Sequence, residues 1–313
     1  MKRVICLMYL LLNIISPFKA ETIQPIDTIP FEIGADNRIY VTVHINGNEN
    51  IPLKFLLDTG ATDIVINSNS SRTKGIISFN KYVSNNSANS SEIIPATDNS
   101  QTIKVGKQVI SQLKFISISY PPDIWDGVLG LSFLKNFDVV IDYKQRNIFL
   151  YKCGNGNKIA SKEYIELDFE YRMGVPVTQI GICINEKTYS VYVEIDSGSD
   201  RVFDLNTHFV KNNNLIGTKK PFAISTISGT AINEGKLLNV FFDYIKIGKI
   251  TLPRIPGAFS TVKNGIQASD TMDGVIGNNL LQRFNQIYDF KNNKIYLEVN
   301  DRLYTPFYNF LID

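Results

Sequence analysis

The chain has 313 residues, with 32 lysines and arginines against 30 aspartates and glutamates. A formal net charge of +2 without a basic stripe argues against nucleic-acid binding and against attachment to an anionic membrane surface. Phe and Tyr are plentiful, turn residues recur, and long helical periodicity is scarce, so we expect a mostly β protein.

The first twenty residues have the layout of a secretory signal peptide. Lys2 and Arg3 precede an apolar run at 4–15, which Ser16-Pro17 interrupts. The run is too short to span a bilayer as a helix, which disfavours the alternative of a retained anchor. We therefore expect residues 1–20 to be removed and the mature protein to be secreted or periplasmic, without membrane contact.

Removal of that segment would also remove Cys6 and leave two cysteines, Cys153 and Cys183. Two cysteines are not a disulfide framework, although they could pair in an oxidising compartment. The sequence leaves both the bonded and the free state open.

The rest of the chain repeats itself once. Three blocks recur in the same order, at 51–67 and 189–206, at 103–107 and 245–249, and at 126–151 and 273–298. Two copies do not make a solenoid, but they can bury one shared interface around an approximate two-fold axis, where residues come in pairs. We therefore predict two lobes, at 21–155 and 156–313, behind a signal peptide at 1–20.

Short strands and turns dominate both copies. Alternating apolar residues on both sides of Asn46-Gly47 predict a β-hairpin. Segments 145–151 and 292–298 read as further strands, and 131–137 and 278–284 as one short helix per copy. The polar stretch at 84–100 reads as a loop or a hairpin tip.

Two matched tetrapeptides carry the chemistry, DTGA at 58–61 and DSGS at 196–199. Each follows an apolar strand, where a buried acid needs hydrogen-bond partners. A glycine two positions later permits a tight turn that directs the carboxylate away from the strand end. A lone Asp there is commonly a turn cap, whereas a matched pair indicates a carboxylate dyad.

These residues identify a family resemblance. The chain resembles pepsin-like and retropepsin-like aspartic peptidases, particularly bacterial proteins with two retropepsin-like units in one chain. The resemblance covers roughly 38–299 and also rests on two apolar residues and a glycine at 128–130 and 275–277. It implies an all-β, bilobal, pepsin-like fold with pseudo-two-fold symmetry, one short helix per lobe and a cleft between the lobes.

The resemblance also implies the chemistry of an aspartic endopeptidase. Asp58 and Asp196 would be the catalytic dyad, in which one carboxylate activates a water molecule and the protonated partner polarises the scissile carbonyl. The residues that would support the dyad are Thr59, Gly60, Ser197, Gly198 and Ser199. The partner would be a peptide or protein substrate, with no metal or organic cofactor. Because both half-sites lie in one chain, we expect an active monomer.

Two further expectations concern the surroundings of the dyad. The family's β-hairpin flap would lie around 82–94, with Tyr82 as the nearby tyrosine, and its counterpart around 225–232. The Ser199 hydroxyl could donate to Asp196, whereas Ala61 in the first motif has none. That difference would leave Asp58 harder to ionise and move the acid limb of the activity profile upward.

Other acids read as structural. Six aspartates lie near the repeated blocks: Asp126, Asp273, Asp142, Asp289, Asp63 and Asp200. The first four are expected to cap turns or to accept from backbone amides, and the last two to pair within their own lobes rather than contact substrate.

Rival functions remain open. The fold could persist in a catalytically inactive binding or scaffolding protein, since fold does not fix function. Paired carboxylates also serve glycosidases, where their separation decides the outcome. With only His44 and His208 and no HExxH motif, a zinc peptidase lacks ligands. The substrate and its cleavage sites cannot be deduced from the sequence.

Overall fold

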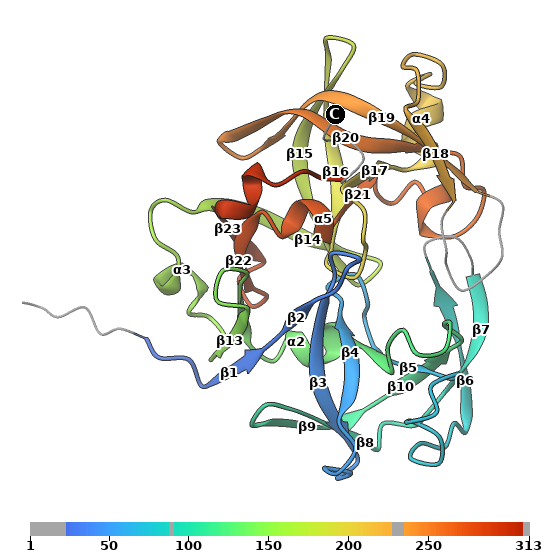
Figure 1. The fold of residues 1–313 in the computed structure, drawn as a ribbon, viewed down its shortest axis with the longest axis vertical. Helices are drawn as coiled ribbons and strands as arrows, with labels where there is room; N and C mark the ends of the chain where they lie inside the picture. The colour runs from blue at the N-terminus through green and yellow to red at the C-terminus, as the bar shows by residue number, and fades with distance from the viewer. Residues whose placement is uncertain (1–22, 88–90, 227–234, 309–313) are drawn as a thin grey trace, which may run out of the picture.

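The structure is a computed structural model that describes residues 23–87, 91–226 and 235–308 (Figure 1). The predicted signal peptide at 1–20 lies outside these residues. Within them, strands dominate and form one sheet of ten strands and one of thirteen, which confirms the expected mostly β fold. No described helix is long and apolar enough to cross a membrane.

The ten-stranded sheet belongs to the first copy. Its path is β6-β7-β10-β5-β11-β4-β3-β8-β9, with β2 on β3. The strands are β2 (Glu32–Ile33), β3 (Ile39–Ile45), β4 (Leu53–Leu57), β5 (Ile64–Asn67), β6 (Lys81–Asn86), β7 (Ser91–Ala96), β8 (Gln101–Val105), β9 (Gln108–Leu113), β10 (Phe115–Ile118) and β11 (Gly127–Leu129).

The thirteen-stranded sheet combines strands from both copies. Its path is β1-β13-β12-β22-β23-β14-β15-β16-β21-β17-β20-β19-β18. The strands are β1 (Asp27–Pro30), β12 (Asp138–Asp142), β13 (Asn147–Tyr151), β14 (Ile165–Arg172), β15 (Val175–Ile184), β16 (Lys187–Asp196), β17 (Phe203–Leu205), β18 (Ala223–Thr226), β19 (Lys236–Ile247), β20 (Ile250–Ser260), β21 (Gly274–Gly277), β22 (Phe284–Asp289) and β23 (Lys294–Val299).

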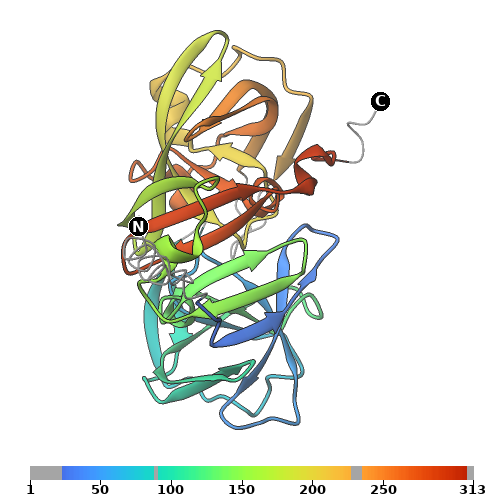
Figure 2. The same cartoon turned by 90° about the vertical axis from the view of Figure 1, so that its left-hand side faces the viewer.

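The two copies are joined through β12 and β22, the strand that follows the short helix in each copy. Val139 lies opposite Tyr288, and Val140 opposite Ile287, in antiparallel register. In Figure 2 the blue-to-green half of the chain fills the lower part of the molecule and the yellow-to-red half the upper part. A continuous ladder of backbone hydrogen bonds therefore runs from one half into the other.

The strand pairings repeat as the sequence does. β4 runs parallel to β11, which lies antiparallel to β5, and β5 runs parallel to β10. The second copy has the same arrangement in β16, β21, β17 and β20. The internal duplication is thus visible in the topology. The division at 155/156 stays a prediction.

The predicted turns and helices are present. Asn46 and Gly47 both have positive φ, at 50° and 74°, in the connection between β3 and β4. The expected helices are α2 (Leu131–Leu134) and α5 (Asn278–Leu281), one turn each. The other helices among the described residues are α3 (Gly156–Ile159), α4 (Thr207–Asn212), η1 (Ile266–Ala268) and η2 (Asp301–Tyr304).

Both described cysteines are free. Cys153 is partly exposed and Cys183 is buried. The structure therefore decides the question that the sequence left open, in favour of two unpaired thiols.

Candidate active site

The two Asp motifs begin where two central strands end. Asp58 follows β4, whose neighbour β11 places Leu129 beside Leu57. Asp196 is the last residue of β16, and β21 places Gly277 beside it. Each acid therefore lies at the end of its own strand, beside a parallel neighbouring strand.

The glycine of each downstream element lets the turn of the Asp motif close. A Cβ atom on Gly130 would lie 2.6 Å from the Ala61 carbonyl oxygen, and one on Gly277 would lie 2.9 Å from Ser199 Oγ. No side chain fits in either place. The residue after this glycine donates its backbone N–H to the loop that carries the aspartate. In the first copy, the Leu131 N–H donates to the Ala61 carbonyl oxygen at 2.8 Å.

Four hydrogen bonds between Thr59 and Ser197 and their surroundings tie the two loops together. The Thr59 N–H donates to Ser197 Oγ and the Ser197 N–H to Thr59 Oγ1, each at 3.0 Å. The hydroxyls then donate onward, Thr59 to Ile195 O at 2.6 Å and Ser197 to Leu57 O at 2.9 Å. Both side chains are buried, so water does not compete for these bonds.

This brace brings the carboxyl groups of Asp58 and Asp196 together, and a hydrogen bond joins them. Asp58 Oδ1 accepts from the Gly60 N–H at 2.7 Å, and Asp196 Oδ1 accepts from the Gly198 N–H at 2.9 Å. Each glycine also lies against the opposite acid. A Cβ on Gly60 would be 2.9 Å from Asp196 Oδ1, and one on Gly198 would be 2.7 Å from Asp58 Oδ1. Both motifs therefore need glycine at this position.

The electrostatics of the pair favour a retained proton. Burial raises the pKa of Asp58, and the hydrogen bond with Asp196 opposes that rise. Burial raises the pKa of Asp196 well above its usual range, and the negative charges of Asp58 and Glu194 add to the rise. Two like charges at this distance cannot both form easily, so the pair titrates in two coupled steps.

The Ser199 hydroxyl does not form the expected hydrogen bond to Asp196. It accepts from the Arg201 N–H at 3.3 Å, and Asp196 instead receives the backbone N–H of Ser199 at 3.1 Å. The Ala61 N–H likewise bonds to Asp58. Among the described residues, the expected hydroxyl asymmetry is thus not seen as a hydrogen bond to Asp196.

Several residues near the carboxyl groups have no signal in the sequence. The Arg38 guanidinium lies 4.7 Å above the Trp125 ring and donates to Gly198 O at 3.4 Å. Its charge lowers the pKa of Asp58, against the larger effect of burial. Tyr120 packs on Trp125, with ring centroids 5.2 Å apart. Burial raises the pKa of its phenol, and the negative charges of Asp58 and Asp196 add to the rise.

The expected flap region of the first copy is a hairpin. β6 and β7 pair in antiparallel register, with Tyr82 opposite Pro95. Ser87 O accepts from the Ile266 N–H at 2.9 Å, so the hairpin reaches the second copy. Tyr82 is 75% exposed. In the second copy β18 pairs with β19, whereas 227–234 lie outside the described residues.

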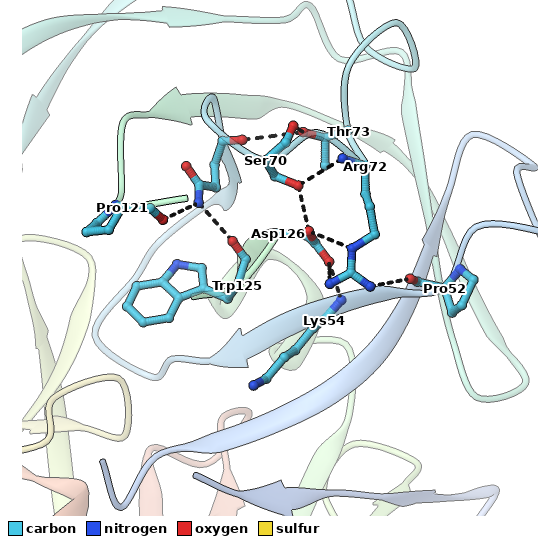
Figure 3. Close-up of polar contacts among 9 residues, drawn as sticks. Pro52, Lys54, Ser70, Arg72, Thr73, Pro121, Trp125 and Asp126 are labelled. Atoms are coloured by element: carbon cyan, nitrogen blue, oxygen red, sulfur yellow. Dashed lines mark hydrogen bonds and ion pairs between the residues drawn. The ribbon is translucent and has the colours of Figure 1, made fainter. Parts of the chain in front are cut away.

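The structural role expected of the other acids is confirmed at the turns. Figure 3 shows Asp126 directed at Ser70, at Arg72 and at the Lys54 backbone. Its carboxylate accepts from Ser70 Oγ at 2.6 Å and from the Lys54 N–H at 2.7 Å, and it pairs with Arg72 at 3.0 Å. Asp273 accepts from a backbone amide at 2.8 Å.

The remaining four acids differ in their partners. Asp142 and Asp289 accept from backbone amides within their own turns. Asp63 pairs with Lys114 of its own lobe at 3.0 Å. The charge of Asp200 acts on its neighbour Arg201 in the same lobe, as expected, and also on Arg38 of the other copy.

Among the described residues, no group of three or more His, Cys, Asp or Glu side chains is arranged to hold a metal ion.

Comparisons with known proteins bear on the family and the fold. Residues 41–136 match the family model described as gag-polyprotein putative aspartyl protease. No curated protein matches the chain. The crystal structure of the aspartic proteinase from Irpex lacteus superposes with a TM-score of 0.58 at 14% identity, over 89% of this chain and 98% of that one. The family model covers part of the first copy and the solved structure shares the fold of the whole, so both support a relationship to aspartic peptidases.

Proposed function

We propose that the protein is an aspartic endopeptidase whose catalytic pair is Asp58 and Asp196. The observation that carries the proposal is the hydrogen bond between these two carboxyl groups, held in place by the reciprocal bonds of Thr59 and Ser197. A turn cap would need no such partner from the other half of the chain.

The chemistry requires one proton on the pair. The ionised carboxylate takes a proton from a water molecule as the water oxygen attacks the scissile carbonyl carbon, while the protonated carboxyl donates to the carbonyl oxygen. Collapse of the resulting tetrahedral diol breaks the C–N bond, and the leaving nitrogen receives a proton. Water is the nucleophile, so no covalent acyl-enzyme forms.

The substrate is proposed to be a peptide or protein segment lying between the two lobes. The β6–β7 hairpin supports this, because it already contacts the second copy through Ser87 and Ile266. Both half-sites come from one chain, which supports an active monomer without a cofactor. Secretion or a periplasmic location rests on the sequence of residues 1–20 alone.

Incubation with a diverse peptide library and sequencing of the cut sites tests the activity. Binding of a pepstatin-like transition-state analogue tests the site itself, since such analogues bind far more tightly than substrates. We expect wild-type protein to bind the analogue and Asp58→Asn to lose that affinity. Equal binding by both proteins would favour the inactive scaffold, and so would a folded wild type that neither cuts nor binds.

A further inference from the structure

A third carboxyl group lies beside the proposed pair. Glu194 precedes Asp196 by two residues on β16 and stands opposite Val275 of β21. The equivalent residue of the first copy is Leu56, which stands opposite Val128 of β11. At these equivalent positions the first copy therefore has an apolar side chain and the second copy has an acid.

Glu194 is directed into the pair rather than toward solvent. Its side chain is 4% exposed. A Cβ on Gly60 would lie 2.8 Å from Glu194 Oε1 and 2.9 Å from Asp196 Oδ1, so both oxygens meet over the same face of that glycine. Gly60 belongs to the loop that begins with Asp58. The Glu194 carboxyl thus reaches across from the second copy to the first.

In the part of the chain that the structure describes, no cationic side chain pairs with Glu194. Its strand partners at this register, Val177 on β15 and Val275 on β21, are apolar. The charged groups that face it are Asp58 and Asp196. Among the residues that the structure describes, no group forms a hydrogen bond with its carboxyl. A buried carboxylate without a partner is costly, so the protonated form is favoured.

We propose that Glu194 is a positioning residue that sets how many protons the Asp58–Asp196 pair retains as the pH rises. The inference rests on the proposed function. Burial, and after it the charge of Asp58, raises the pKa of Glu194 to about 8, which agrees with the geometry. Below that pH the group is neutral and leaves the pair unaffected. Above it, a new negative charge over Gly60 holds the remaining proton on the pair.

The proposal predicts an effect on one limb of the pH profile. The acid limb of kcat/KM should be the same in wild type and Glu194→Gln, because both side chains are neutral there. The basic limb should lie about one pH unit lower in Glu194→Gln, because no charge then opposes loss of the last proton from the pair. Glu194→Leu, which copies the first lobe, should behave like Glu194→Gln. Glu194→Asp should restore the wild-type limb.

The matched control is Glu166→Gln, the same chemical change at an exposed acid that pairs with Lys294. It should leave both limbs in place. A purely structural role for Glu194 would lower the rate at every pH alike. Coincident basic limbs in wild type and Glu194→Gln would overturn the proposal.

A second readout does not depend on activity. Infrared difference spectra at pH 7 should show the band of a protonated buried carboxyl group that is missing in Glu194→Gln and present in Glu166→Gln. An inactive wild type that shows this band would refute the proposed function and not the protonation of Glu194. Absence of the band would refute the inference, whatever the activity.

Discussion

The hydroxyl of Thr59 makes two of the four bonds that connect the halves at the carboxyl pair. Thr59→Val keeps the shape of the side chain but leaves the buried Ser197 N–H and the Ile195 carbonyl without their partner. An unsatisfied buried group costs about 1–3 kcal/mol. We expect the free energy of unfolding, measured with urea, to fall by about 2–4 kcal/mol.

The control is Thr59→Ser, which keeps the hydroxyl and loses only a methyl group. It should lose about 1 kcal/mol or less. If Thr59→Val and Thr59→Ser have the same free energy of unfolding, the hydrogen bonds of the Thr59 hydroxyl do not contribute to stability.

Glu194 makes stability depend on pH. Its pKa rises from an ordinary 4.5 to about 8 in the folded protein. The advantage of the protonated folded form is therefore complete below pH 4.5 and is lost as the pH rises toward 8. Glu194→Gln removes this dependence. We expect it to equal wild type near pH 4 and to be more stable above pH 8 by about 2–4 kcal/mol.

Thermal unfolding of both proteins across this range would measure the difference. A constant difference between the two at every pH would mean that folding does not shift the pKa of Glu194.

At the scale of residues, the sequence predicts what the repeat duplicates. Asp58, Asp196, Thr59 and Ser197 could be named because matched motifs imply matched positions. Glu194 could not be named in this way, because it lies against Gly60 of the other copy and has no acidic counterpart in the first copy. The predicted hydrogen bond from the Ser199 hydroxyl to Asp196 was wrong for a related reason. The backbone N–H of Arg201 donates to the Ser199 hydroxyl, and this contact cannot be read from the four-residue motif.

At the scale of elements, Asp126 and Asp273 occupy equivalent positions with unequal partners. Asp126 accepts from Ser70, from the Lys54 backbone and from Arg72, whereas the bond recorded for Asp273 is the one from the Tyr192 N–H. We expect Asp126→Ala to lower the free energy of unfolding by about 3 kcal/mol and Asp273→Ala by about 1–2 kcal/mol. Chemical denaturation measures both.

The equivalence of position makes each variant the control for the other. Equal losses would show that the extra partners of Asp126 are compensated by water. Neither variant should move the pH limbs of activity, because neither acid contacts the carboxyl pair.

The strands and the two short helices beside the motifs followed from local pattern, since alternation and turn residues are local properties. The order of the strands did not follow. The pairing of β12 with β22 joins segments about 145 residues apart, and strands of five or six residues carry too little information to select one partner among many. α3 and α4 escaped prediction because helices of four to six residues are too short to show periodicity.

At the scale of the whole molecule, the two copies share one sheet and one large hydrophobic core. The β12–β22 register places Val140 against Ile287, which is fully buried. Halves that share a core should unfold together. We expect one calorimetric transition for wild type, and Ile287→Ala should lower its midpoint without splitting it, at a cost of about 2–4 kcal/mol.

Two separate transitions in wild type would show that the lobes fold independently. A split that appears in Ile287→Ala alone would place most of the coupling in this one contact.

The central claim is that Asp58 and Asp196 act together as the catalytic pair. The most direct measurement is kcat/KM of Asp58→Asn and Asp196→Asn on a peptide that wild type cleaves, with Asp142→Asn as a control at an exposed turn. Loss of the shared proton chemistry should reduce the rate by at least about 10³-fold in either catalytic variant, and the control should stay within about threefold of wild type. Activity within tenfold of wild type in either variant, with the fold intact, would contradict the claim.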